Sequence, residues 1–209
     1  VDLENTTHEH ILRRTEIMRL LLILLSKPMY VTKETLCMSS MQALEFMTCE
    51  LERPVVLSFL CSLLNTVANY RQAERWKILG ADAVRDTYTS LCLEILCALL
   101  SYEPASNHSN LFLFYTRKLY RESDFLFLMN GTGKIFRESM AVTNGAFEMG
   151  SARSTFVKAP EEHVSEMLAV IWTLLRTNNK LCETVTQSPR IAFDMLSWLL
   201  YVALSNKCS

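Results

Sequence analysis

Apolar side chains recur at intervals of three and four residues along almost the whole chain, and no segment alternates apolar with polar residues. A repeat close to 3.6 residues places side chains on one face of an α-helix, whereas a half-buried β-strand needs alternation. The 209 residues include only five glycines and five prolines, which turn-rich β folds use heavily and helices avoid. The pattern therefore predicts an all-α protein.

Stretches with such an apolar stripe end near prolines, glycines or polar clusters. We expect roughly six to eight helices of about ten to twenty residues each. The clearest segments are 7–26, 54–70, 82–101 and 161–176.

Several of these segments are apolar over more than half of their circumference. A helix with two apolar faces has to be covered from two sides, as in stacked layers of helices. We therefore expect an α-solenoid of the armadillo or HEAT type, with stacked helix pairs. Residues 1–209 would form a single helical-repeat domain or a segment of a longer solenoid. Within it, 143–158 contains Asn144-Gly145, Gly150 and several small residues, and is the predicted mobile loop.

Two apolar runs, Met18–Leu25 and Ile191–Leu204, are shorter than the roughly 20 residues that a membrane-spanning helix needs. We interpret both as buried core helices. The chain begins at Val1 without a basic-then-apolar signal pattern, so we expect an interior piece of a longer protein.

The net charge of −1 gives no overall reason to expect binding to nucleic acid or to anionic membranes. Local basic clusters lie on predicted amphipathic helices, where a solvated polar face is the more common explanation than a phosphate-binding surface. They are Arg13, Arg14 and Arg19, and Arg117, Lys118 and Arg121. The seven cysteines form no Cys-x-x-Cys pair, which favours reduced thiols acting as small buried hydrophobes.

Histidines offer the first candidate for a metal site. His8-Glu9-His10 begins like a zinc-binding helix, but the second histidine should stand where Leu12 stands. His163 follows two acidic residues at a predicted helix start, where acidic side chains offset the helix dipole. Surface and capping roles are therefore favoured.

Gly131-Thr132-Gly133-Lys134 is similar to part of a phosphate-binding loop. The full pattern needs a glycine where Leu128 stands and Ser or Thr where Ile135 stands, and no strand precedes it. The cysteines lack a neighbouring base, and no nucleophile elbow is present. Trp76, Trp172 and Trp198 are interpreted as core or groove anchors. We therefore expect no catalytic, cofactor-binding or metal-binding residues, no cofactor and no enzyme.

Five strings occur together in order. They are RTEIMRLLL (14–22) with Ser26 and Met29-Tyr30; SLLNTV (62–67) with Tyr70; NLF (110–112) with Tyr115; YRE (120–122) with Asp124, Phe125 and Phe127; and Glu162, Leu168 and Trp172 with Asn179-Lys180. Their order and spacing resemble the high-temperature-induced dauer-formation protein family, which is distantly akin to dymeclin. The resemblance covers nearly the whole chain and corresponds to an interior N-terminal portion of longer proteins, with fungal or other lower-eukaryote members the closer relatives.

The resemblance implies a helical-repeat scaffold without enzymatic activity, acting in Golgi or trans-Golgi vesicle trafficking and protein sorting. Its partners would be other proteins of the trafficking machinery, and not nucleic acid. Its location would be the cytoplasmic face of Golgi and trans-Golgi membranes, and the cytosol. Some members use an N-terminal acyl site, so membrane association would involve parts absent from this chain. The segment 143–158 departs from the family pattern.

Two other hypotheses remain open from the residues. One is an all-α enzyme or small-ligand carrier with a pocket between helices. The other is a subunit that folds only with the rest of its chain or with a partner.

Overall fold

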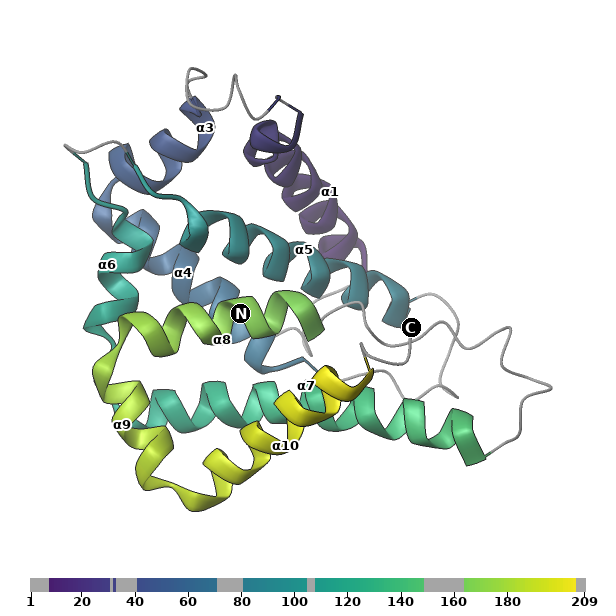
Figure 1. The fold of residues 1–209 in the computed structure, drawn as a ribbon. Coiled ribbons are helices and arrows are strands. Elements are labelled where there is room, and N and C mark those ends of the chain that lie inside the picture. The colour runs from purple at the N-terminus through teal and green to yellow at the C-terminus, as the bar shows by residue number, and fades with distance from the viewer. Residues whose placement is uncertain are drawn as a thin grey trace.

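The computed structural model describes residues 8–30, 32, 41–70, 81–104, 108–148 and 164–205. Every regular element within these ranges is helical, so the all-α prediction is confirmed (Figure 1). The elements are α1 (His8–Leu25), the 3-10 turn η2 (Lys27–Tyr30), α3 (Gln42–Glu45), the π-helical segment η3 (Phe46–Glu50), α4 (Arg53–Ala68), α5 (Ala81–Ser101), α6 (Leu111–Lys118), α7 (Glu122–Glu148), α8 (Val164–Thr177), α9 (Asn179–Gln187) and α10 (Pro189–Ser205). In this described part, six α-helices have ten residues or more.

The long helices pack as stacked pairs around α5. Helix α1 lies along one side of α5, α8 lies along another, and α4 packs behind it (Figure 1). Helix α7 packs against α4 and α8, and α10 contacts α7 and α9. This arrangement confirms the expected solenoid-like stacking, because each inner helix is covered by more than one neighbour.

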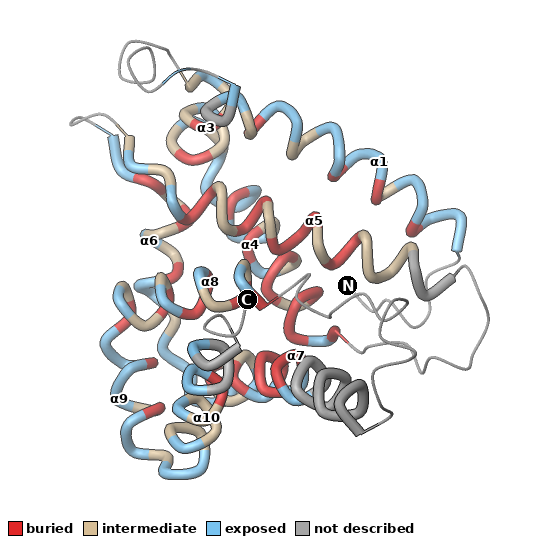
Figure 2. Tube along the Cα trace, turned by 45° about the vertical axis from the view of Figure 1, so that its right-hand side comes forward, coloured by how far each residue is buried: buried red, intermediate tan, exposed pale blue. Residues whose placement is uncertain are grey.

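Helix α5 shows why two apolar faces require such stacking. Leu93 and Ile95 are fully buried, although two residues along a helix point to nearly opposite faces. Leu96 and Leu99 are also fully buried. Figure 2 shows buried positions recurring along α5. Burying each such side chain stabilises the fold by about 1.5–3 kcal/mol. A helix buried on opposite faces cannot lie on the surface of a single bundle layer.

The glycines of α7 permit close helix packing. A Cβ at Gly131 would lie 2.5 Å from the Cα of Ala68, so α7 and α4 meet backbone to backbone. A Cβ at Gly133 would lie 2.8 Å from Cη2 of Trp198 in α10. The Trp198 ring also stacks on Phe136, with 4.9 Å between ring centroids. Glycine weakens the interior of a helix, but these two glycines let α4 and α10 approach α7 closely.

The predicted loop 143–158 is wrong in its first six residues, because α7 continues to Glu148. An Asn-Gly pair such as Asn144-Gly145 is typical of turns. A helix nevertheless tolerates one glycine at a cost of about 1 kcal/mol. The helix begins well before them at Glu122, and propagation from an existing helix is easier than nucleation. Residues 149–158 lie outside the described ranges.

The cysteines are buried less often than expected. Among the described residues, five cysteines are free thiols, of which only Cys92 is fully buried. Cys49 and Cys97 are partly buried, whereas Cys61 and Cys182 are exposed. Cysteine tolerates an exposed position because its side chain is small, so an apolar neighbourhood in sequence does not decide its burial.

Candidate interaction surfaces

The histidine near-match for a metal site is on the surface. His8 and His10 are exposed at the start of α1, and Glu9 between them forms an ion pair with Arg13 at 2.5 Å. Across the ranges that the structure covers, no three His, Cys, Asp or Glu residues are grouped so that they could hold a metal ion. His163 lies outside the described residues.

The glycine-rich near-match lies inside α7, so its backbone is helical and cannot form a phosphate-binding loop. The Thr132 hydroxyl donates a hydrogen bond to the Leu128 carbonyl at 2.8 Å. It also lies 3.7 Å from the Met167 sulfur in α8. These residues therefore serve helix packing between α7 and α8.

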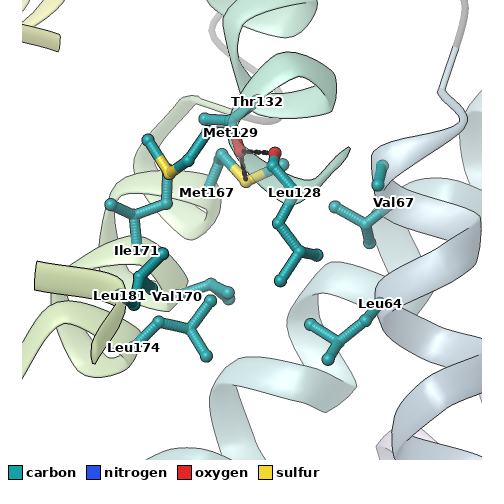
Figure 3. Close-up of a pocket in the computed structure, with 11 residues that line it drawn as sticks. Leu64, Val67, Leu128, Met129, Thr132, Met167, Val170, Ile171, Leu174 and Leu181 are labelled. Atoms are coloured by element: carbon teal, nitrogen blue, oxygen red, sulfur yellow. Dashed lines mark hydrogen bonds between the residues drawn. The ribbon is translucent and has the colours of Figure 1, made fainter. Parts of the chain in front are cut away.

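A small cavity lies where α4, α7, α8 and α9 meet (Figure 3). Its lining is almost entirely apolar, and Leu64, Met129 and Ile171 point toward it from three helices. The cavity volume is about 20 Å³, roughly the space of one water molecule. It is a packing defect of the core and gives no support to the carrier hypothesis.

A partly buried polar cluster lies between α5 and α8. The Cys97 thiol donates to the Glu166 backbone carbonyl at 3.3 Å. Burial, with the carboxylates of Glu166 and Glu94, raises the pKa of Cys97 to about 12. Burial, and then repulsion by Glu166, also raises the pKa of Glu94. A thiol with so high a pKa stays protonated at neutral pH and is a poor nucleophile.

An apolar face of α10 is exposed. Ile191 and Met195 pack partly against the core and Trp198 is buried, but the opposite side presents apolar residues at helical spacing to solvent. Among the apolar side chains on this side of α10, Phe193 has the largest exposed fraction, 70%. The outer face of α10 comprises Phe193, Leu196, Leu199 and Leu200.

An apolar face of α1 is exposed in the same way (Figure 2). Ile11, Thr15, Met18 and Leu25 face the core. The outer face of α1 comprises Leu12, Ile17, Leu20, Ile23 and Leu24, with Ile17 66% exposed.

The interpretation of both apolar runs as buried core helices is therefore wrong for one side of each helix. Helices α1 and α10 are the outer members of the described stack, so each has neighbours on one side only. Of the tryptophans expected to be core or groove anchors, Trp198 is buried in the core, whereas Trp172 is 67% exposed on α8 and does not belong to the core. Trp76 lies outside the described ranges.

No single helix in the described ranges has both the length and the apolar composition to cross a membrane. The segments Gln42–Glu50 and Arg53–Ala68 reach these limits only when they are taken together, and the chain bends by 105° between them.

Two buried asparagines join helix ends, Asn110 within a short stretch of the chain and Asn178 across about 60 residues. The side-chain oxygen of Asn110 accepts hydrogen bonds from the first turn of α6, and its NH2 group donates to the carbonyls of Leu99 and Tyr102 at the end of α5. Asn178 repeats this arrangement: it caps α9 and donates to the carbonyls of Thr116 and Leu119 at 2.7 and 2.9 Å. Helix α6 is thereby fixed at both ends.

A groove of about 540 Å³ lies between the end of α5, helix α6 and the end of α8. Arg117 and Arg176 line it from opposite helices, beside the 40% exposed ring of Phe114. Beyond the groove, Arg121 and Lys180 each lie 5.9 Å from the ring centre of Tyr120. We call this groove, with Lys118, Tyr120, Arg121 and Lys180 around it, the basic edge.

The sequence identified only half of the basic edge. It placed Arg117, Lys118 and Arg121 in one cluster, but it did not connect them with Arg176 or Lys180, which lie about 60 residues later. The Asn178 hydrogen bonds to α6 bring the two groups together. The available signal was Asn178 itself, since an asparagine before an apolar helix often caps it.

Comparisons with known proteins agree with the resemblance noted in the sequence. The family of the high-temperature-induced dauer-formation protein matches residues 2–208. The chain belongs to this family. Members of the high-temperature-induced dauer-formation family that resemble it include the Ubp5-interacting protein ftp105 of Schizosaccharomyces pombe, 26% identical over 96% of this chain and 23% of the relative.

Two further relatives are protein HID1 of mouse and protein HID1 of human. Each is 25% identical to this chain, over 92% of this chain and 26% of the relative. The chain thus spans about a quarter of the length of these relatives. No solved structure is significantly similar to it.

Proposed function

We propose that this member of the high-temperature-induced dauer-formation family is a non-enzymatic scaffold or adaptor in Golgi or trans-Golgi vesicle trafficking and protein sorting. The observation that carries the proposal is the pair of exposed apolar faces on α1 and α10. Soluble proteins rarely leave such contiguous apolar surface without a binding role. The cytoplasmic face of Golgi membranes and the cytosol are the proposed locations, by analogy with the family.

Relatives support a role in binding proteins. The Schizosaccharomyces pombe relative is named for its interaction with Ubp5, and stacked helices offer the extended surfaces that solenoids use for such contacts. The relatives are about four times as long as this chain, so some of the apolar faces would contact further helices of a longer family protein.

Within the described ranges, the enclosed cavity does not favour the carrier alternative. The cavity among α4, α7, α8 and α9 holds about 20 Å³, far below the roughly 300 Å³ of common small-molecule sites. The basic edge is open to solvent and has the character of a binding surface for a larger partner.

Proximity labelling of the protein in cells tests the proposal. A scaffold of this pathway is expected to label proteins of the trafficking machinery and to lie next to Golgi markers. The same fusion carrying Phe193→Ser and Leu196→Ser should lose part of that labelled set, because both side chains belong to the outer face of α10. Labelling of unrelated cytosolic proteins only, with a diffuse distribution, would contradict the proposal.

A further inference from the structure

We propose that the basic edge is the docking site for an acidic, extended segment of a partner protein. This inference rests on the proposed scaffold function and names the chemistry of one partner. Its argument depends on charge, on the shape of the groove and on the way in which the groove walls are held.

The charge of the basic edge differs from that of the chain. The whole chain has a net charge of −1, yet five cations meet here from α6, the start of α7 and the α8–α9 corner. They are Arg117, Lys118, Arg121, Arg176 and Lys180. Within the described residues, neither Arg117 nor Arg176 forms an ion pair. These two guanidinium groups are therefore available to carboxylates.

Acidic residues near the edge offset only part of this charge. Glu103 lines the groove, and His108 on the same wall lies 3.7 Å from Glu45. Asp124 accepts a hydrogen bond from Ser123 at the start of α7 and lies close enough to interact with Arg121. The groove lining holds two arginines, Arg117 and Arg176, against one carboxylate, Glu103, so a positive excess remains inside the groove.

Exposed aromatic rings, Phe114 in the groove and Tyr120 beside it, give the basic edge an apolar component. Lys118 Nζ lies 5.5 Å from the ring centre of Phe114, and Tyr120 is 63% exposed between Arg121 and Lys180. An acidic segment with interspersed apolar residues would satisfy both kinds of contact, because its carboxylates reach the arginines while its apolar side chains cover the rings.

The shape of the groove favours a peptide over a membrane surface. Its walls come from three helices, and its volume of about 540 Å³ is a recess that an extended chain can enter and a flat bilayer cannot. Asn110 and Asn178 fix both ends of α6, so the walls are preformed and binding does not have to order them.

Fluorescence anisotropy with a labelled short peptide of glutamate and leucine tests the proposal on the 209-residue chain. The peptide should bind, and a matched peptide of glutamine and leucine should not. The variant with Arg117→Gln and Arg176→Gln should bind the acidic peptide about tenfold more weakly, because two exposed ion pairs of at most about 1 kcal/mol each are lost. Binding should also weaken as salt is added.

The control variant carries Arg53→Gln and Arg190→Gln. Both arginines are exposed in the first turns of α4 and α10, so the change in net charge is the same. The control should bind the acidic peptide as the unchanged chain does. Circular dichroism would verify folding, and if the double variant were unfolded, Lys180→Gln alone should still weaken binding.

Equal affinity for both peptides, or equal weakening in the control variant, would overturn the proposal. Vesicles of phosphatidylcholine with phosphatidylserine provide the competing arm. If they bound through Arg117 and Arg176 while the peptide did not, the edge would be a lipid surface instead. Proximity labelling that still recovered trafficking proteins would leave the scaffold function standing while this assignment failed.

Discussion

Asn178 shows how one side chain can determine the relation of two distant helices. It is 3% exposed, and its amide serves an α9 backbone N–H and two α6 carbonyls at once. Without it, the carbonyls of Thr116 and Leu119 would lose their side-chain donor inside the protein, where water cannot replace it.

Asn178→Ala should lower the free energy of unfolding by roughly 2–4 kcal/mol, because both the helix cap and the donors to two carbonyls are lost. Urea denaturation followed by circular dichroism measures the change. Asn179→Ala, at the neighbouring exposed position, should stay within about 0.5 kcal/mol of the unchanged chain. Equal effects of the two substitutions would contradict this role of Asn178.

The two glycines of α7 make a second prediction at the residue scale. Gly131→Ala should destabilise the protein by about 1–3 kcal/mol, although alanine is the better helix former. Its Cβ would collide with the backbone of Ala68, which cannot move aside. Gly133→Ala meets chiefly the edge of the Trp198 ring and should cost less. Thermal unfolding would compare the stability of the two variants. A larger loss of stability for Gly133→Ala than for Gly131→Ala would contradict the close backbone contact between α7 and α4.

Among the elements, α5 is the one whose packing most clearly disfavours an ionised side chain, Glu94. Its central position buries part of Glu94 next to Glu166 of α8. The Oε2 atom of Glu166 has no hydrogen-bond partner among the described residues. This carboxyl pair is less stable when both groups are ionised, so the contact between α5 and α8 depends on pH.

Glu94→Gln should raise the melting temperature at neutral pH and leave it unchanged in acid. The raised pKa means that the folded state favours the protonated carboxyl, so its contribution is complete below the unfolded pKa and is lost as pH rises through the folded pKa. Solvent limits the gain to less than about 1 kcal/mol, since the group is only partly buried. Thermal melts of both proteins across the pH range measure the difference in melting temperature. If Glu94→Gln still raised the melting temperature in acid, ionisation of Glu94 could not be the cause.

At the scale of the whole molecule, the described helices form a stack with an apolar face on each outer helix. Each inner helix is covered from two sides, while α1 and α10 are covered from one. The relatives are about four times as long as this chain, and in them such faces would be suited to contacts with further helices or with partners.

The exposed faces should make the 209-residue chain associate with itself as its concentration rises. Phe193→Ser with Leu196→Ser should reduce both light scattering and binding of an apolar dye, with little loss of stability, because these side chains contact solvent. Trp198→Ser on the buried side of α10 is the contrast, and it should destabilise the fold by about 3–5 kcal/mol. Unchanged scattering in the double variant would show that another surface drives association.

The helices and their apolar stripes could be predicted from the sequence alone. A 3.6-residue repeat is a local property, so segments such as 54–70 and 82–101 were placed close to α4 and α5. The sequence also identified the family through strings in order. The prediction of helix boundaries failed at 143–148, where α7 continues, since weak turn signals do not stop a helix that is already formed.

Packing between helices determines which apolar side of each helix is covered and which cations lie next to one another. Ile17 and Ile11 look alike in the stripe of α1, yet one faces solvent and the other faces α5. Arg117 and Arg176 became neighbours across a groove because buried asparagine hydrogen bonds joined their helices. Such pairings depend on contacts across many residues, and periodicity within one helix carries no information about its neighbour.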